Sequence, residues 1–215
     1  MESKVTGKFE IERRDWLKAA GLASAASLLA GKRAFAESAG TPAAKVRGVV
    51  FMVSDGMSPG VLTLAEAYSK LTRQHGTQWW SLLNDKKAAR GLMDTASANS
   101  MVTDSAAASS AWGGGQRVNN GSINITTDGR PVTPIAEILK KKDVRIGLVS
   151  TATITHATPA GFAAAVSKRK DEDDISPQYL ERVDVLLGGG SGHFSAKDRL
   201  DKRDLAGDFA KAGYG

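Results

Sequence analysis

Three short apolar runs constrain the fold of this 215-residue chain more than any other feature. They lie at residues 49–53, 146–149 and 185–187, and none shows the strict alternation of a half-buried strand. Such runs are typical of strands buried on both faces of a parallel sheet. Helix-like stretches lie between and after them, at residues 60–71, 105–112, 134–141, 159–168 and 200–212. Strands that alternate with helices predict a layered α/β fold.

Polar side chains follow two of the predicted strands. Asp55 comes directly after the first strand, and His156 and Thr158 come after the second. Because ligands of open α/β sheets bind beyond the carboxyl ends of the strands, we expect these three side chains at the reactive edge. Residues 116–130, which are rich in Asn, Gly, Ser and Thr, are predicted to form a surface connection.

Ser105 stands at the start of a predicted helix, after Asp104 and before an alanine-rich stretch. Either Thr103 or Asp104 can cap the first turn. The unpaired N–H groups and the dipole of a helix start attract a phosphate group. On this motif alone two interpretations stay open: Ser105 is a reactive serine beside a phosphate site, or it only begins a core helix.

Four segments, taken together and in this order, carry a family resemblance. They are VVFMVSDGM at residues 49–57, TDSAA at 103–107, STATITHATPA at 150–160, and Arg169 followed by DVLLGGG at 184–190. Over about residues 46–192 the chain resembles the bacterial alkaline phosphatases. The resemblance implies a three-layer α/β/α sandwich with a largely parallel central sheet, incomplete in this chain. It also implies metal-dependent hydrolysis of phosphomonoesters through a phosphoserine intermediate.

The resemblance assigns a role to each matched residue. Ser105 matches the nucleophile, whose oxygen also binds zinc, and Arg169 matches the arginine that holds two phosphoryl oxygens. A planar guanidinium suits that task because its donors form a fork. Asp55 matches an aspartate that bridges a zinc and a magnesium ion, and Thr158 matches a hydroxyl ligand of the magnesium. Asp104 is expected to orient Arg169 rather than to bind metal.

His156 stands where some family members carry aspartate and others histidine. Magnesium prefers oxygen ligands and imidazole suits zinc or cobalt, so the identity of the third metal stays open. His156 either binds a metal directly or acts through water, and we favour the second interpretation. His75 and His193 are not expected to be ligands. The glycine-rich residues 188–192 lack the lysine and spacing of a P-loop and are predicted to be a loop that ends a strand.

The ligand count is too small for the two zinc ions that the resemblance implies. Each tetrahedral zinc needs about three protein ligands. Asp55 and Ser105 are the only candidates for direct zinc contact, and no Asp-x-x-x-His pair occurs. We therefore interpret residues 37–215 as the N-terminal part of a phosphatase catalytic domain, and we expect this chain to be inactive by itself.

Residues 1–36 resemble a twin-arginine export signal. Arg13 and Arg14 precede a short apolar stretch, and Ala34-Phe35-Ala36 has the small-x-small form of a cleavage site. The apolar stretch is about a dozen residues, too short to span about 30 Å of hydrocarbon. The sequence therefore predicts a periplasmic or secreted protein without stable membrane insertion.

The net charge of +6 does not indicate a nucleic-acid partner. The leader holds seven Lys or Arg and four Asp or Glu, so half of the excess lies there. The chain has no cysteine, which excludes disulfides and thiolate metal sites. The predicted partners are small phosphomonoesters, and a homodimer is possible since family members often form one.

Two other functions stay open at this point. One is a phosphodiesterase on the same fold, and the other is a non-catalytic exported domain that binds phosphate. A sulfatase is disfavoured because Ser105-Ala106-Ala107 lacks the Ser-x-Pro-x-Arg setting of those enzymes.

Overall fold

The computed structural model describes residues 46–215, which divide into two units, one ending at Val53 and one spanning Ser54–Gly215. The predicted export signal lies outside the described residues. In the first unit, residues 46–53 form no regular element, so the strand predicted at 49–53 is wrong. Val49 and Val50 are more than four-fifths exposed. An apolar run favours burial, but a strand also needs a hydrogen-bonded neighbour, which local sequence cannot supply.

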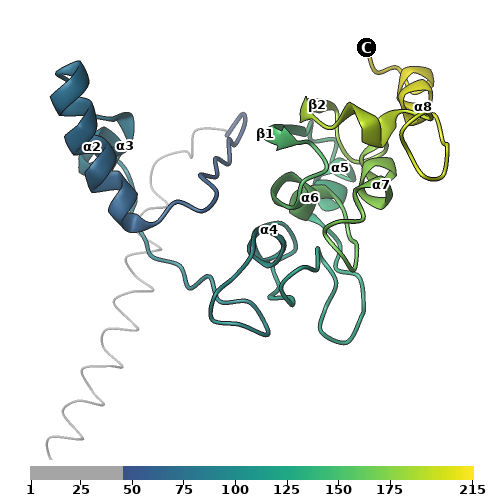
Figure 1. Cartoon of the computed structure of the whole chain (residues 1–215), viewed down its shortest axis with the longest axis horizontal. Helices are drawn as coiled ribbons and strands as arrows, with labels where there is room; N and C mark the ends of the chain where they lie inside the picture. The colour runs from purple at the N-terminus through teal and green to yellow at the C-terminus, as the bar shows by residue number, and fades with distance from the viewer. Residues whose placement is uncertain (1–45) are drawn as a thin grey trace, which may run out of the picture. The chain divides into compact units, whose positions relative to one another are not determined.

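The second unit contains a two-stranded parallel sheet of β1 (Gly147–Thr153) and β2 (Val185–Gly189). Figure 1 shows the two strands side by side. Gly147 pairs with Val185, and Thr153 pairs with Gly189 after an irregularity in the ladder. The strands predicted at 146–149 and 185–187 are therefore confirmed, and so is their parallel pairing. Their predicted burial is not, because Val149, Val185 and Leu187 are exposed. Both strands run toward the same edge of the sheet, where β1 leads directly into a helix.

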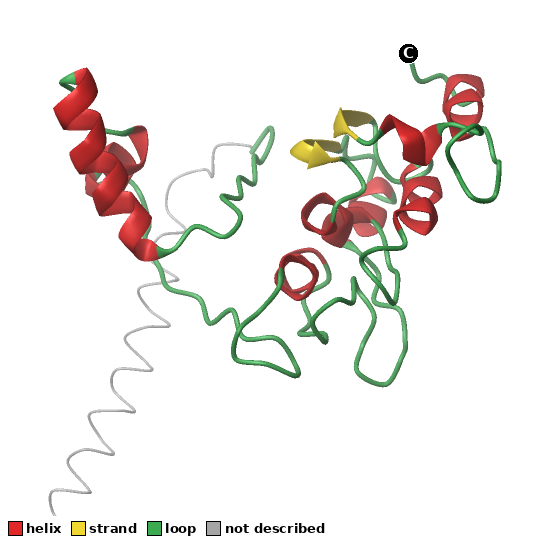
Figure 2. Ribbon diagram, in the orientation of Figure 1, coloured by secondary structure: helices red, strands yellow, loops and turns green. Residues whose placement is uncertain are grey.

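Helices make up most of the regular structure (Figure 2). In chain order they are α2 (Pro59–Arg73), α3 (Gln78–Asn84), α4 (Ser105–Gly113), α5 (Ile135–Lys140), α6 (Ala157–Ala163), α7 (Glu172–Ile175) and α8 (Leu205–Lys211), with 3-10 helices η2 (Ser176–Tyr179) and η3 (Ser191–Phe194). The helices predicted at 60–71, 105–112 and 134–141 are confirmed. The one predicted at 200–212 begins only at Leu205, because the Asp204 carboxylate caps that point by accepting the Gly207 N–H.

The helix predicted at 159–168 is wrong in its second half. α6 ends at Ala163, and Ala164 is fully extended with φ −135° and ψ 165°. Val166 then exchanges two backbone hydrogen bonds with Ile123, at 2.9 and 3.0 Å. Tertiary pairing therefore overrides the helix propensity of the alanine-rich sequence. Arg169 consequently lies in a turn shortly before α7 and not at the end of α6.

Residues 116–130 form a connection with exposed ends, as their composition predicts, but the middle of the segment is buried. Ile123 and Asn124 are fully buried. The Asn124 amide donates to the carbonyl oxygens of Gly161 and Ala164 at 2.7 and 2.8 Å, and so holds the end of α6. Polar residues in this segment satisfy buried backbone groups rather than solvent.

Helices α4 and α6 pack together unusually closely because glycines face each other. A Cβ on Gly113 would meet the Gly161 carbonyl oxygen at 2.1 Å, which no side chain tolerates. Ser109 of α4 donates to the Ala157 carbonyl oxygen at 2.8 Å across the same interface. This packing fixes the start of α6 against α4, which is where the predicted site residues lie.

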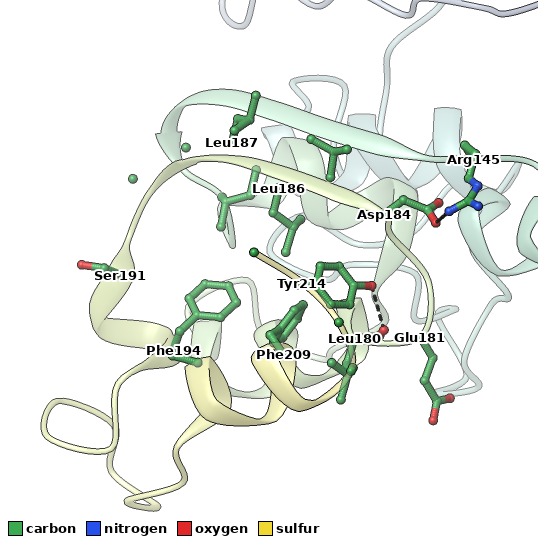
Figure 3. Close-up of a pocket in the computed structure, with 18 of the residues that line it drawn as sticks. Arg145, Leu180, Glu181, Asp184, Leu186, Leu187, Ser191, Phe194, Phe209 and Tyr214 are labelled. Carbon is green, nitrogen blue, oxygen red and sulfur yellow. Dashed lines mark hydrogen bonds and ion pairs between the residues drawn. The ribbon is translucent and has the colours of Figure 1, made fainter.

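An open cavity of about 1040 Å³ lies beside β2 and α8. Figure 3 shows the rings of Phe194, Phe209 and Tyr214 next to one another along it, with Asp184 and Arg145 at one end. None of the predicted catalytic or metal-binding residues lines it. Within residues 46–215, no helix is long and apolar enough to cross a membrane.

Candidate active site

Ser105 is the first residue of α4, as its sequence setting predicts. Asp104 is the N-cap, and its carboxylate accepts the Ala107 N–H at 2.9 Å. The cap orients the first turn, whose N–H groups have no acceptor within the helix. The Ser105 hydroxyl therefore stands at the positive end of a nine-residue helix.

Asp55 joins two hydroxyl groups that are far apart in the sequence. Its Oδ1 accepts from the Ser105 hydroxyl at 3.2 Å, and its Oδ2 accepts from the Thr158 hydroxyl at 2.8 Å. Gly56 follows with φ +68°, a conformation that glycine adopts without strain. The turn after Asp55 thus lets one carboxylate face the starts of α4 and α6 together.

His156 and Thr158 lie where β1 passes into α6. A turn at residues 154–155 ends β1, and the His156 N–H donates to the Thr153 carbonyl oxygen at 3.0 Å. His156 is the N-cap residue of α6, with extended backbone, and Thr158 lies in the first turn. Both side chains are half-buried.

Arg169 lies between Asp104 and His156. One guanidinium nitrogen, Nη1, donates to Asp104 Oδ2 at 3.1 Å, and the other, Nη2, lies 3.0 Å from His156 Nε2. Arginine only donates, so His156 Nε2 is the acceptor and the ring proton is on Nδ1. The predicted contact of Asp104 with Arg169 is therefore confirmed, while the contact with His156 was not anticipated.

Asp104 is held in turn by Asn120 and Gly121, which follow the Ser105 motif in the sequence. Its N–H donates to Asn120 Oδ1 at 3.0 Å, and its Oδ2 accepts the Gly121 N–H at 2.9 Å. The Arg169 N–H donates to the Gly121 carbonyl oxygen at 2.7 Å. These contacts span 16 to 48 positions of sequence, so no local pattern could have revealed them.

The other two histidines lie apart from this group. His75 Nδ1 contacts the neighbouring Gly76 carbonyl oxygen at 2.9 Å in an exposed loop. His193 faces two carboxylates, with Nδ1 2.8 Å from Asp173 and Nε2 3.2 Å from Glu172. Burial raises the pKa of Asp173, but hydrogen bonds from His193 and the Leu200 N–H outweigh it, so the net shift is downward.

The site residues fit one hard divalent cation better than they fit zinc. Asp55, Ser105 and Thr158 bring one carboxylate and two hydroxyl oxygens together, and oxygen donors are what magnesium prefers. Residues 46–215 contain no group of three His, Asp or Glu side chains arranged to hold a metal. The described part of the chain therefore does not supply the ligands of two zinc ions.

Comparisons with known proteins give one consistent result. The family model described as alkaline phosphatase matches residues 46–214. The chain is 33% identical over 181 residues to alkaline phosphatase 4 of Bacillus subtilis, covering 80% of this chain and 38% of that protein. It is 31% identical over 217 residues to streptomycin-6-phosphate phosphatase of Streptomyces griseus, covering 87% of this chain and 46% of that protein.

Solved structures show the same relationship. The alkaline phosphatase of Thermus thermophilus superimposes with a TM-score of 0.72 at 38% identity, over 76% of this chain and 34% of that chain. A histidine-to-glutamate mutant of the TAB5 alkaline phosphatase, solved with Mg bound, gives 0.61 at 30% identity over 71% and 42%. The predicted α/β fold of this family is thereby confirmed. The chain spans between about a third and a little under half of the length of these relatives.

Proposed function

The chain belongs to the alkaline phosphatase family, and we propose that the complete protein hydrolyses phosphate monoesters at the site formed by Ser105, Asp55 and Arg169. The observation that carries the proposal is the double contact of Asp104. This residue caps the helix that begins with Ser105 and also binds the Arg169 guanidinium at 3.1 Å. Asp104 thus positions both the nucleophile, Ser105, and the phosphate-binding guanidinium of Arg169.

The proposed chemistry proceeds in two displacements at phosphorus. Ser105 Oγ attacks, an oxygen–phosphorus bond forms, and the bond to the alcohol oxygen breaks. Asp55 Oδ1, 3.2 Å away, is placed to accept the hydroxyl proton during the attack, and that proton then passes to the departing alcohol oxygen. Water then attacks the phosphoserine, releasing inorganic phosphate and restoring Ser105.

Arg169 and the helix start stabilise the charge on the non-bridging oxygens in both steps. The guanidinium offers paired donors, and the first-turn N–H groups of α4 add partial positive charge. Asp104 keeps Arg169 in place because it binds Nη1 and leaves the remaining donors for other contacts.

A divalent cation fits the oxygen atoms of Asp55 and Thr158, and we propose magnesium at this position. Bound there, it would supply positive charge that favours the ionised serine and the developing phosphoryl charge. The TAB5 enzyme was solved with Mg bound in mutants that replace a histidine by glutamate or aspartate. We propose His156 as the equivalent position in this chain.

The two zinc ions expected from the family need ligands in addition to those of residues 46–215, so we propose that this chain by itself is inactive. We further propose that residues 1–36 direct the protein to the periplasm or outside the cell by the twin-arginine route. Replacing Arg13 and Arg14 by lysines should then leave unprocessed precursor in the cytoplasm. Normal export of that variant would contradict this route.

The function is tested with the complete protein, purified with zinc and magnesium. Wild-type protein should hydrolyse p-nitrophenyl phosphate faster than bis(p-nitrophenyl) phosphate, and acid quenching with labelled phosphate should leave label on the peptide that contains Ser105. Ser105→Ala should lose the label and reduce turnover by about 10³-fold or more, while its melting temperature stays close to that of wild type. Ser81→Ala, an exposed serine of α3, serves as a control that should retain the label.

The outcomes separate the alternatives. Faster hydrolysis of the diester would favour the phosphodiesterase. Phosphate binding without hydrolysis of either ester would favour a non-catalytic phosphate-binding domain. Label on a residue other than Ser105 would contradict the assignment of the nucleophile.

A further inference from the structure

Glu172 lies outside the group of residues proposed for catalysis, but its carboxylate contacts the turn that carries two of them. Its Oε2 accepts from the Thr153 hydroxyl at 2.8 Å and also from the Thr155 hydroxyl. Thr153 is the last residue of β1, and Thr155 is a fully buried residue of the turn before α6. One carboxylate oxygen thus holds both sides of the turn.

The same turn leads into the proposed site within three residues. His156 follows Thr155 and accepts from Arg169 at 3.0 Å, and Thr158 donates to Asp55 at 2.8 Å. Any rotation of the turn would displace both contacts, because the two residues belong to the first turn of α6 or its cap. Burial of Thr155 leaves its hydroxyl no solvent alternative to Glu172.

Glu172 is also three residues from Arg169 along the chain. The segment of residues 169–172 therefore contacts the His156 region at two points, through the Arg169 guanidinium and through the Glu172 carboxylate. These two contacts together define the separation between the Arg169 guanidinium and the His156 imidazole. The Arg169 contact alone would not prevent the turn between β1 and α6 from rotating.

A second support comes from β2. His193, in the 3-10 helix after this strand, lies 3.2 Å from Glu172 Oε2 and 2.8 Å from Asp173 Oδ1. Glu172 is about one-fifth exposed, and its Oε2 has three polar neighbours. The ends of both strands are thereby attached to α7 through one side chain.

We propose that Glu172 is a positioning residue for the phosphatase site: by fixing the turn between β1 and α6, it places His156 against Arg169 and Thr158 against Asp55. The inference rests on the function proposed above. Glu172 itself contacts neither substrate nor metal. It affects the binding of phosphate through the position of Arg169.

The test uses the complete protein with three substitutions. Glu172→Ala removes the acceptor, Glu172→Gln retains one oxygen that can accept both threonine hydroxyls, and Glu181→Ala removes an exposed carboxylate as a matched control. We expect Glu172→Ala to raise the inhibition constant of inorganic phosphate about tenfold, since small misplacements of a phosphate-binding group have large effects. Glu172→Gln should stay within about twofold of wild type, because an amide oxygen replaces the carboxylate as acceptor.

Crystal structures of the same variants provide a measurement that does not depend on activity. Glu172→Ala should lengthen the Arg169 Nη2 to His156 Nε2 separation beyond about 3.5 Å, while Glu181→Ala keeps it within hydrogen-bond range. If wild-type protein neither binds nor hydrolyses phosphate esters, the proposed function fails, and this separation alone decides the role of Glu172.

Two results would overturn the inference. One is an unchanged phosphate inhibition constant and an unchanged separation in Glu172→Ala. The other is a lower melting temperature in both Glu172 variants while their inhibition constants for phosphate equal that of Glu181→Ala. This result would make Glu172 a purely structural residue. Should Glu172→Ala fail to fold, Glu172→Gln decides: wild-type phosphate inhibition and separation support the inference, and a loss of either contradicts it.

Discussion

Thr158 donates a hydrogen bond to Asp55 at 2.8 Å although 103 positions separate the two residues. The contact joins the turn before α2 to the first turn of α6. Asp55 uses its other oxygen for Ser105, so three elements meet at one carboxylate. Oxygen atoms gathered in this way can hold a cation that none of the three segments could hold alone.

The first prediction concerns the Thr158 hydroxyl. Thr158→Val keeps the shape of the side chain but removes the oxygen, so the magnesium affinity of the complete protein should fall about tenfold or more. Thr158→Ser retains the hydroxyl and should stay close to wild type. Calorimetric titration of metal-free protein with magnesium measures both. Equal affinities for the valine and serine variants would show that Thr158 is not a ligand.

The second prediction separates the two roles of Asp104. Asn is as good an N-cap as Asp, but its Nδ2 cannot accept the Gly121 N–H, so Asp104→Asn should lower the free energy of unfolding by about 1 kcal/mol. It removes the charge that binds Arg169, so the KM for a phosphomonoester should rise. Asp104→Ala loses the cap as well and should be less stable than Asp104→Asn by about 1 kcal/mol. An unchanged KM in Asp104→Asn would contradict the positioning of Arg169 by this carboxylate.

Local sequence predicted the parts of the site that depend on one segment. The helix start at Ser105 follows from Asp104 and the alanines after it, and the two strands follow from the apolar runs at 146–149 and 185–187, although β1 continues to Thr153 and β2 to Gly189. His156 and Thr158 were expected after a strand and do follow β1, whereas the run before Asp55 forms no strand. These features need no knowledge of distant residues.

The contacts that fix Arg169 could not be predicted in the same way. The sequence from Pro159 to Lys168 favours a helix, but Val166 pairs with Ile123 and Arg169 lies in the turn before α7. The contacts of Asn120 and Glu172 do not follow from the residues next to them in the sequence. Their roles arise only when segments 16 to 19 positions away fold against them.

The third prediction concerns stability in acid. Hydrogen bonds from Lys140, the Ile146 N–H and Arg145 lower the pKa of Asp184, with Lys140 the largest cause and burial opposing it. A carboxyl whose pKa is lower in the folded state stabilises the fold fully above its unfolded pKa of about 3.9. That stabilisation is lost as the pH falls through the lower folded-state value.

Asp184→Asn should therefore lower the free energy of unfolding at neutral pH by about 2 kcal/mol, because two charged partners lose their acceptor. The difference from wild type should shrink as the pH falls from about 4 toward 2. Denaturant unfolding at a series of pH values measures it, and Asp143→Asn, an exposed carboxyl nearby in the sequence, serves as control. A difference that stays constant with pH would contradict this origin of the stabilisation.

The last prediction concerns His156→Asp. The substitution replaces the imidazole that accepts from Arg169 by a carboxylate, which can accept the same hydrogen bond and also offer an oxygen to a cation. Magnesium content should rise, and activity should depend less on added zinc or cobalt. His156 is the N-cap of α6, where Asp is favoured, so the melting temperature should stay the same or increase slightly.

His156→Asn is the matched control, because it keeps the cap without adding charge. If the charge is what attracts magnesium, only the Asp variant should gain metal. Metal analysis and a thermal melt of the same preparations measure both effects. A large drop in melting temperature with unchanged magnesium content would show that the half-buried His156 is a structural residue, since an unpaired buried carboxylate destabilises the fold by several kcal/mol.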